Sequence, residues 1–323
     1  MTKSKKAFIK KLISWSGLFF FALAAFMIYH QLSRYTLSEI KDAILSVPRK
    51  NILWACLASF CGYVALSSYD FLALKYIGKK LAAWRWIFAG FVGFSVSNNA
   101  GHAIVSGGAI RFRLYSRWRV SASDIVKMVT FSGFTYLVAC FFLIIIGFGC
   151  SPHHLGSESS GYLVNWILVF FSVIGLMFYL WGSAYYKKPI IIKEVEFTPP
   201  GIKLALAQVI IGSIDILMAS LVLYSILVHF MDIPFITFIG TFIIAQVLGV
   251  YSQVPGGLGV FEVMFSNLLP DDDANKATIF AILVLYRIIY YLLPLVISGI
   301  ALFFYEFGLA MRRKRIRNNK QVL

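Results

Sequence analysis

The sequence has few charged residues and lacks the short motifs of several common enzyme classes. Charged side chains make up 14% of the 323 residues, against 59% for hydrophobic ones, and the mean hydropathy is +0.79. No G-x-x-x-x-G-K-[ST] nucleotide loop occurs, and neither does H-E-x-x-H or G-x-S-x-G. ATP-driven export by this chain alone is therefore disfavoured. The composition is typical of a polytopic membrane protein.

Patterns of metal-binding residues are also missing. The cysteines lie in or beside apolar stretches without C-x-x-C spacing, and no histidine stands near them in a ligand position. His102 is a lone histidine, which suits a proton relay or, more simply, a hydrogen bond to an exposed carbonyl group. The sequence predicts no metal and no cofactor. The cysteines are expected to serve in packing: Cys56, Cys61, Cys140 and Cys150.

Basic residues outnumber acidic ones by 30 to 14, and the formal net charge is +16. They form short clusters beside apolar runs. Clusters of this kind set the orientation of membrane helices and contact anionic lipid. We therefore expect membrane lipids as partners and no nucleic acid, while assembly into a homo-oligomer stays open.

Six apolar stretches reach the roughly 20 residues that a helix needs to cross a bilayer. They are residues 12–32, 52–74, 125–149, 163–184, 204–230 and 278–307. Two more apolar stretches, 86–105 and 235–265, contain polar, glycine-rich breaks. Non-helical backbone survives at membrane depth only where protein buries it or water lines it, so the breaks indicate an enclosed polar path.

The distribution of Lys and Arg predicts how the broken stretches are arranged. If each enters and leaves by the same face, most basic clusters lie inside, including the N-terminal lysines and a basic cytoplasmic tail at 309–323. If both crossed fully, the arginine cluster at 111–119 would be exported. The sequence thus predicts an all-α polytopic membrane protein with six spanning helices, two re-entrant hairpins and cytoplasmic termini. An outer amphipathic helix is expected where apolar residues recur at helical spacing: Leu37, Ile40, Ile44 and Val47.

The two halves of the chain resemble each other. The segment around Asp70 (68–72, SYDFL) is similar to the segment around Asp215 (213–217, SIDIL). A glycine pair follows each: Gly107 and Gly108 in the first half, Gly256 and Gly257 in the second. Short matches also arise by chance in such helices, which is the alternative.

Re-entrant hairpins would make the two acidic spans run in opposite directions. That arrangement is an inverted repeat, a common architecture of secondary transporters, which place the substrate site where the repeats meet. We expect one integral-membrane domain over 1–323, with repeats at about 51–150 and 203–308.

Three ordered motifs resemble one family of membrane proteins. They are Gly107-Gly-Ala-Ile-Arg-Phe-Arg-Leu-Tyr115, Val254-Pro-Gly-Gly-Leu-Gly-Val-Phe-Glu262 and Arg287-Ile-Ile-Tyr-Tyr-Leu-Leu-Pro294. Over nearly its whole length the chain resembles the lysylphosphatidylglycerol synthase transmembrane region family, the flippase-like part of the multiple peptide resistance factor. The resemblance implies a bacterial or archaeal cytoplasmic-membrane protein that moves an anionic or aminoacylated phospholipid between leaflets. It also implies a standalone membrane domain, because no aminoacyl-transferase domain follows before Leu323.

Four groups are candidates for gating or proton coupling. Asp215 lies roughly 17 Å into its span at 1.5 Å per residue, near the midplane. An ionisable group there costs about 3 to more than 10 kcal/mol and must face a partner or water. Asp70 comes late in its span, near Lys75, so a solvated carboxylate is the alternative to a functional one. Glu262 could act as gate or counter-ion, and His102 is the fourth candidate.

Three arginines are candidates for binding the substrate. Arg287 falls about ten residues into the last span, where its guanidinium could bind a lipid phosphate bidentately. The alternative is a fixed ion pair with Glu262 or Asp215, and the two roles can coexist if a carboxylate holds the arginine between cargo arrivals. Arg111 and Arg113 could cradle a phosphate together with the amides of the first glycine pair, or they could simply set topology.

Neutral polar residues complete the candidate site. Asn98, Asn99 and Gln253 can line a wet groove, or they can form hydrogen bonds between helices. Pro294 should kink the last span.

The sequence favours a transporter over an enzyme. Fixed Arg and Asn groups would replace the water that a lipid headgroup loses in the membrane, while the tails stay in lipid. The alternative is an integral-membrane, phosphatidylglycerol lysyltransferase-like enzyme or its non-catalytic partner, which would use the carboxylates on a lipid-linked substrate.

Overall fold

The computed structural model describes residues 37–100, 103–150, 159–192, 195–252, 254–269 and 276–321. The expected first span at 12–32 lies outside these residues, and so do His102 and Gln253.

Most of this part of the chain is helical, and its helices form two similar successions. The first is α2 (Leu37–Ser46), α3 (Arg49–Tyr76), α4 (Ala83–Ala100), α5 (Ala103–Arg117), α6 (Ala122–Gly149) and α7 (Ser159–Tyr185). The second is α8 (Ile202–Leu227), α9 (Phe235–Tyr251), a 3₁₀ turn (Pro255–Gly257), α10 (Val260–Leu268), α11 (Lys276–Arg287), a π-helical turn (Ile288–Leu292) and α12 (Leu293–Gln321). In both successions a long helix precedes a pair of shorter helices, and another long helical segment follows.

Five helical segments are long and apolar enough to cross a membrane. They are Arg49–Tyr76, Ala122–Gly149, Leu163–Tyr185, Ile202–Leu227 and Thr278–Met311. They coincide with five of the six spans that the sequence predicts, and α2 forms where the amphipathic helix is expected. The chain is thus a multi-pass membrane protein built of α-helices.

A small β-hairpin departs from the all-α prediction. β1 (Ile190–Ile192) and β2 (Val195–Phe197) connect α7 to α8 as an antiparallel pair, with Ile190 opposite Phe197. Ile and Val favour extended backbone because their branched side chains fit a pleated surface. With three residues in each strand, the hairpin leaves the helical architecture unchanged.

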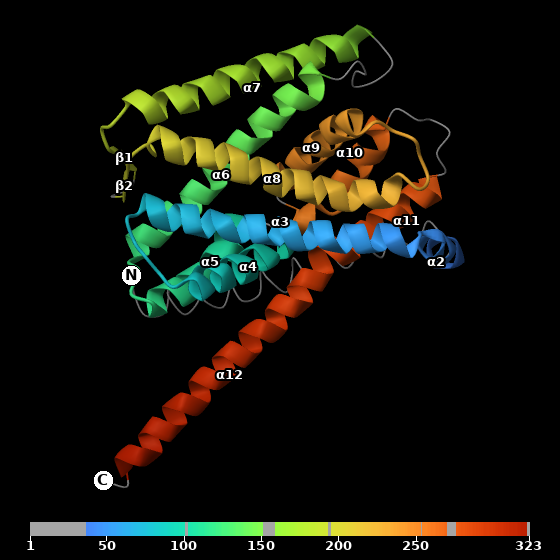
Figure 1. The fold of residues 1–323 in the computed structure, drawn as a ribbon. Coiled ribbons are helices and arrows are strands. Elements are labelled where there is room, and N and C mark those ends of the chain that lie inside the picture. The colour runs from blue at the N-terminus through green and yellow to red at the C-terminus, as the bar shows by residue number, and fades with distance from the viewer. Residues whose placement is uncertain are drawn as a thin grey trace, which may run out of the picture.

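Helices α3 and α8 form the centre of the molecule and run side by side in opposite directions (Figure 1). Small side chains on α3 allow this close approach, as is usual between membrane helices. A Cβ atom on Gly62 would lie 3.3 Å from the Cβ atom of Met218 on α8. The buried small residues of α3 include Ala55, Ala58, Ser59 and Ala65.

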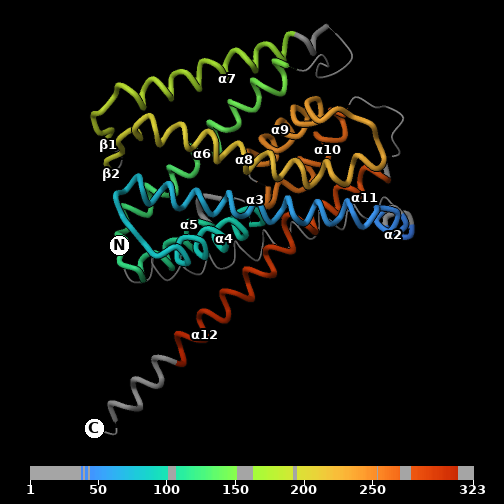
Figure 2. Tube along the Cα trace, viewed as in Figure 1, coloured from blue at the N-terminus to red at the C-terminus, as the bar shows by residue number. Residues whose placement is uncertain are grey.

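The two pairs of short helices enter the molecule from opposite ends. Helix α4 starts and α5 ends at the end where α3 finishes and α8 begins (Figure 1). Helix α9 starts and α10 ends toward the other end, the end at which α2 lies and α3 starts (Figure 1). The trace in Figure 2 shows both pairs reaching from their own end toward the middle. We call α4–α5 the first hairpin and α9–α10 the second hairpin.

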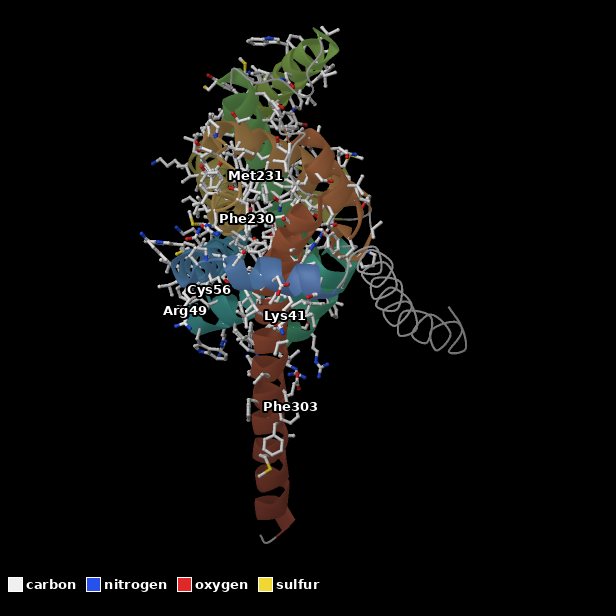
Figure 3. All side chains as sticks on the ribbon, turned by 90° about the vertical axis from the view of Figure 1, so that its right-hand side faces the viewer. Lys41, Arg49, Cys56, Phe230, Met231 and Phe303 are labelled. Carbon is white, nitrogen blue, oxygen red and sulfur yellow. The ribbon has the colours of Figure 1, made fainter. Side chains whose placement is uncertain are left out.

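Polarity is reversed relative to a water-soluble protein. Charged residues are buried inside, at 0 to 9% exposure: Asp70, Arg111, Asp215, Glu262 and Arg287. Large apolar side chains cover the outside at 55 to 72% exposure: Leu53, Trp54 and Phe60 on α3, Phe170, Phe171 and Phe178 on α7, and Phe303 and Phe304 on α12. Figure 3 shows Phe303 on the part of α12 that extends away from the other helices. An apolar exterior of this kind is suited to lipid.

Candidate functional site

The second hairpin turns through a glycine-rich loop. Pro255 opens the 3₁₀ turn, and Gly256, Gly257 and Gly259 have φ angles of 60°, 63° and 80°. This left-handed region is readily open to glycine and unfavourable for residues with a Cβ atom. Pro255 and Gly257 are buried, so the predicted break is irregular backbone enclosed by protein.

An ion pair holds this loop in place. The Nε atom of Arg287 donates a hydrogen bond to Oε1 of Glu262 at 2.8 Å, and Nη2 lies 2.7 Å from the same oxygen. The Nη1 atom donates to the carbonyl oxygen of Gly256. The other carboxylate oxygen of Glu262 accepts the N–H group of Gly259 at 2.7 Å, which caps the start of α10. Glu262 and Arg287 thus bind the glycine-rich loop to α11.

The helix after Arg287 widens into the π-helical turn. Pro294 has no N–H group to offer the carbonyl oxygen of Tyr290, four residues earlier, which widens or kinks a helix. The hydroxyl of Tyr63 on α3 donates to that oxygen at 3.1 Å. Two neighbouring carbonyl oxygens of the turn also accept hydrogen bonds. Ser59 Oγ donates to the carbonyl oxygen of Ile289 at 3.2 Å, and Asn99 Nδ2 donates to that of Tyr291 at 3.1 Å. The kink expected at Pro294 therefore takes the form of a π-helical turn anchored to α3 and α4.

A second buried ion pair lies at the first hairpin. The Nε atom of Arg111 on α5 lies 2.9 and 3.2 Å from the two carboxylate oxygens of Asp70 on α3. Tyr115, one helical turn after Arg111, donates its hydroxyl to the same carboxylate at 2.9 Å. The guanidinium carbon of Arg111 is 4.1 Å from the ring centroid of Phe94. Asp70 is completely buried, so the solvated alternative for this residue is wrong.

Gly107 lets α5 lie close to α4. A Cβ atom there would be 1.7 Å from Ser97 Oγ and 2.9 Å from the carbonyl oxygen of Gly93. Both Gly107 and Gly108 lie within the helix α5, where backbone amides bond to preceding carbonyls. The phosphate cradle expected from their free amides is therefore not formed, and the first break does not extend to these glycines.

Arg113 points away from Arg111, since two positions on a helix are about 200° apart. Its Nη2 atom lies 3.1 Å from Glu306 on α12, and its side chain is 55% exposed. Arg117 forms two hydrogen bonds with the same carboxylate, at 2.7 and 3.0 Å. The predicted arginine pair is thus divided between a buried site and a surface cluster.

Asp215 is the third buried acid, and its partners are neutral. Tyr69 on α3 donates to Oδ2 at 2.9 Å, and Tyr290 of the π-helical turn donates to Oδ1 at 3.4 Å. No Lys, Arg or His among the described residues lies within ion-pair distance of it. Of the two acids expected as alternative partners of Arg287, Glu262 forms the ion pair and Asp215 does not.

The two hairpins meet in the middle of the molecule. A Cβ atom on Gly256 would lie 3.5 Å from the carbonyl oxygen of Asn98 and 3.8 Å from that of Asn99. The end of α4 therefore contacts the glycine loop of the second hairpin. The structure brings Asn98, Asn99, Gly256, Gly257, Glu262 and Arg287 together, while Asp70 and Arg111 form the separate pair on α3 and α5.

Sequence reasoning missed the tyrosines of this interior. Tyr63, Tyr69, Tyr115 and Tyr290 donate their hydroxyls to buried oxygens. A usable signal existed, because tyrosines favour the ends of membrane helices and Tyr63 and Tyr69 stand within a span. In the part of the chain that the structure describes, no three His, Cys, Asp or Glu side chains gather around a common point. The absence of a metal and a cofactor stays a prediction.

Comparisons with known proteins cover both hairpins and both ion pairs. The sequence model described as "Lysylphosphatidylglycerol synthase TM region" matches residues 13–298. An uncharacterized protein of Synechocystis sp. is 32% identical over 94% of this chain and 95% of its own length. The inner membrane protein YbhN of Escherichia coli is 28% identical over 90% of each chain.

The chain is also similar to part of a larger enzyme. Phosphatidylglycerol lysyltransferase of Staphylococcus xylosus is 27% identical over 86% of this chain, but over only 32% of its own length. The chain therefore spans about a third of that relative.

Proposed function

The chain belongs to the lysylphosphatidylglycerol synthase TM region family, and on this premise we propose that it carries a phospholipid between the leaflets of the bacterial inner membrane. The cargo would have an anionic or aminoacylated headgroup, in keeping with the phosphatidylglycerol lysyltransferase name of several relatives. The observation that carries the proposal is a buried arginine at each of two hairpins inside an otherwise lipid-facing molecule.

Arg111 keeps a nitrogen atom for a further ligand, whereas every nitrogen of Arg287 contacts Glu262 or the glycine loop. The Nη2 atom of Arg111 is buried and makes no hydrogen bond within the described residues, and the Nη2 atom of Arg287 lies 2.7 Å from Glu262 Oε1, which a phosphate would have to displace. A guanidinium group presents five donors in a fixed fork that fits a phosphate. Both carboxylates act as resting partners, since each holds its arginine until a phosphate displaces it. The buried charge is then never left without a counter-charge, which would be costly.

The headgroup would cross where the hairpins meet. The half-buried Asn98 lies beside the glycine loop, and its amide can replace part of the headgroup's lost hydration. Asn99 donates to the carbonyl oxygens of Ser95 and Tyr291, so it joins α4 to the π-helical turn. In this scheme the acyl chains remain among the apolar side chains of the exterior.

The membrane topology is part of the proposal. We place both hairpins as re-entrant segments and the segment at 12–32 as a sixth span, with both termini cytoplasmic. Support comes from the end of the molecule at which α3, α5 and α7 finish and α8 begins (Figure 1). Lys75 and Arg117 are in the last turns of α3 and α5, Lys187 follows α7, and Lys203 is at the start of α8. Lys and Arg in short loops stay on the cytoplasmic side. The antiparallel α3 and α8, each followed by a hairpin, favour the inverted repeat with halves at about 51–150 and 203–308.

Lipid exchange in liposomes tests the proposal. Purified protein is reconstituted with fluorescent phosphatidylglycerol, and a membrane-impermeant quencher reports how fast the lipid leaves the inner leaflet. The wild-type protein should accelerate exchange over empty liposomes. Asp70→Asn/Arg111→Met removes the first ion pair without leaving a bare charge, and it should abolish the acceleration. Arg287→Lys keeps the charge but loses the fork, and it should slow exchange about 10-fold or more, as expected for one lost charge-assisted hydrogen bond.

Arg117→Met is the matched control for the first hairpin. It removes an arginine from the same helix, but this arginine pairs with Glu306 at the surface. Its exchange rate should equal that of the wild type. Wild-type rates in the folded Asp70→Asn/Arg111→Met protein would remove Arg111 from the path. A covalently altered lipid, detected by mass spectrometry after incubation, would favour the transferase instead.

A further inference from the structure

The three buried carboxylates of the described interior differ in their counter-charge. Asp70 pairs with Arg111, and Glu262 pairs with Arg287. Asp215, which is 4% exposed, has two tyrosine hydroxyls as hydrogen-bond donors and no ion-pair partner among the described residues. A buried carboxylate without a cation is strongly penalised, and binding a proton removes its charge.

We infer that Asp215 is a proton-binding site, and that it takes up and releases one proton as the protein moves lipid. The coupling to lipid rests on the proposed function, whereas the proton site itself does not. The structure thereby selects one residue from the predicted gating or proton-coupling group, because Asp70 and Glu262 are each held by an arginine. The fourth member, His102, lies outside the described residues.

The groups around Asp215 are phenols and a thiol, which ordinarily ionise only above neutral pH. They come from the helices that pack against α8: Tyr63 and Tyr69 on α3, Tyr136 and Cys140 on α6, and Tyr290 and Tyr291 in the π-helical turn. Glu262 of α10 and Arg287 of α11 pair with each other. Because none of these neighbours supplies a positive charge, a proton is the species that can neutralise Asp215.

Protonation would change the hydrogen bonds that Asp215 makes to two other elements. An ionised carboxylate only accepts hydrogen bonds, so it can hold the hydroxyls of Tyr69 and Tyr290 together. A protonated carboxyl group carries an O–H donor of its own and is a weaker acceptor, so one of the two bonds weakens or reverses. The bond from Tyr290 is the longer, at 3.4 Å against 2.9 Å for Tyr69, so it should yield first.

This bond leads directly to the proposed lipid site. Tyr290 is three residues after Arg287, on the same helical segment, and its carbonyl oxygen is held by Tyr63 of α3. A movement of Tyr290 would therefore shift the segment that carries Arg287 relative to α3 and α8. Proton exchange at Asp215 would in this way alter how firmly Arg287 is held against Glu262 and the glycine loop.

Infrared spectroscopy tests the proton site without any lipid assay. Difference spectra of the purified protein between acidic and alkaline pH should contain a C=O stretching band of a protonated carboxyl group. Asp215→Asn should remove this band, and Asp215→Glu should shift it. Asp232→Asn changes an exposed aspartate just after α8 and should leave the band in place. An unchanged band in both folded Asp215 variants, or its loss in Asp232→Asn, would overturn the inference.

A pH gradient across the liposomes tests the coupling. If one proton moves with each lipid, a gradient of one pH unit should drive an asymmetry of up to about tenfold between the leaflets. Asp215→Asn should abolish this asymmetry. Lipid exchange without any response to the gradient would contradict the coupling and leave the transport proposal standing. If Asp215→Asn loses the infrared band but the wild-type protein exchanges no lipid, the proton site stands and the transport proposal is contradicted.

Discussion

The two hairpins use the same pair of charges in opposite order. In the first hairpin the arginine is on the hairpin helix α5 and the acid, Asp70, is on the long helix α3. In the second the acid, Glu262, is on the hairpin helix α10 and the arginine is on the long segment α11. What the halves share is a charge-paired contact between hairpin and span. If the hairpins move, Arg111 would move with the first hairpin, whereas Arg287 would stay on α11 while the second hairpin moves.

The hairpins also differ in the structural requirement that their glycines meet. The first relies on close approach, since Gly107 lies where any Cβ atom would meet Ser97 of α4. The second relies on backbone conformation, since Gly256 and Gly257 have positive φ angles. Similar glycine pairs in the sequence thus meet different physical demands, and substitutions can separate them.

Breaking the ion pairs should have the largest effect. Removal of one partner from a buried pair typically costs about 3–5 kcal/mol, because it leaves an uncompensated charge. We expect Arg111→Met and Glu262→Gln each to lower the stability of the purified protein by this order, measured by unfolding in detergent. Glu262→Gln should cost more, because Glu262 also caps α10 through Gly259.

The double variant Asp70→Asn/Arg111→Met tests whether the charge itself is responsible. It should regain most of the loss seen in Arg111→Met, because no bare charge is left. Additive losses in the double variant would show that the two side chains contribute independently, contrary to the geometry.

Crowding the first hairpin should have the next largest effect. Gly107→Ala would place a methyl group against the α4 backbone, and overpacking of this kind costs about 1–3 kcal/mol. Gly108→Ala is the matched control, since the atom nearest to its Cβ, Val129 Cγ2, is 4.0 Å away. It should be neutral or gain up to about 1 kcal/mol from helix propensity. Thermal unfolding compares the two, and equal midpoints would contradict the close approach of α4 and α5.

Alanine substitutions in the glycine turn of the second hairpin should lower stability less, and through backbone strain. Gly256→Ala forces a left-handed conformation on alanine, which costs about 1–2 kcal/mol. Gly257→Ala carries the same strain, and its Cβ would lie 3.0 Å from the Cα atom of Gly249 on α9. The order of thermal stability should therefore be wild type, Gly256→Ala, Gly257→Ala. A wild-type unfolding midpoint in Gly257→Ala would show that the loop adopts another conformation.

Features that depend on local chemistry could be predicted from the sequence. Apolar length predicted the spanning helices, and Pro255-Gly-Gly257 predicted the irregular turn because glycine alone reaches its φ angles freely. The pair of Glu262 and Arg287 was among the predicted alternatives. These predictions succeeded because a span needs length and a turn needs particular residues, and both requirements can be recognised within one segment.

Asp70 shows where such reasoning fails. Its position late in α3 suggests a solvated carboxylate, yet Arg111 and Tyr115, more than 40 residues later, enclose it. Depth along a helix says nothing about which neighbour covers its side. Arg111 and Arg113 illustrate the same point, since two arginines of one motif point to a buried acid and to the surface.

The amino-acid sequence by itself determined that this chain enters a membrane, where its helices run and which family it belongs to, because hydrophobic length and ordered motifs need no knowledge of neighbours. Only the tertiary structure decided which charges are paired and which acid lacks a cation. A buried charge is stabilised or penalised by the groups that surround it in space. In this protein α5 supplies the partner of Asp70 on α3, α11 supplies the partner of Glu262 on α10, and within the described residues only tyrosines of α3 and the π-helical turn reach Asp215 on α8.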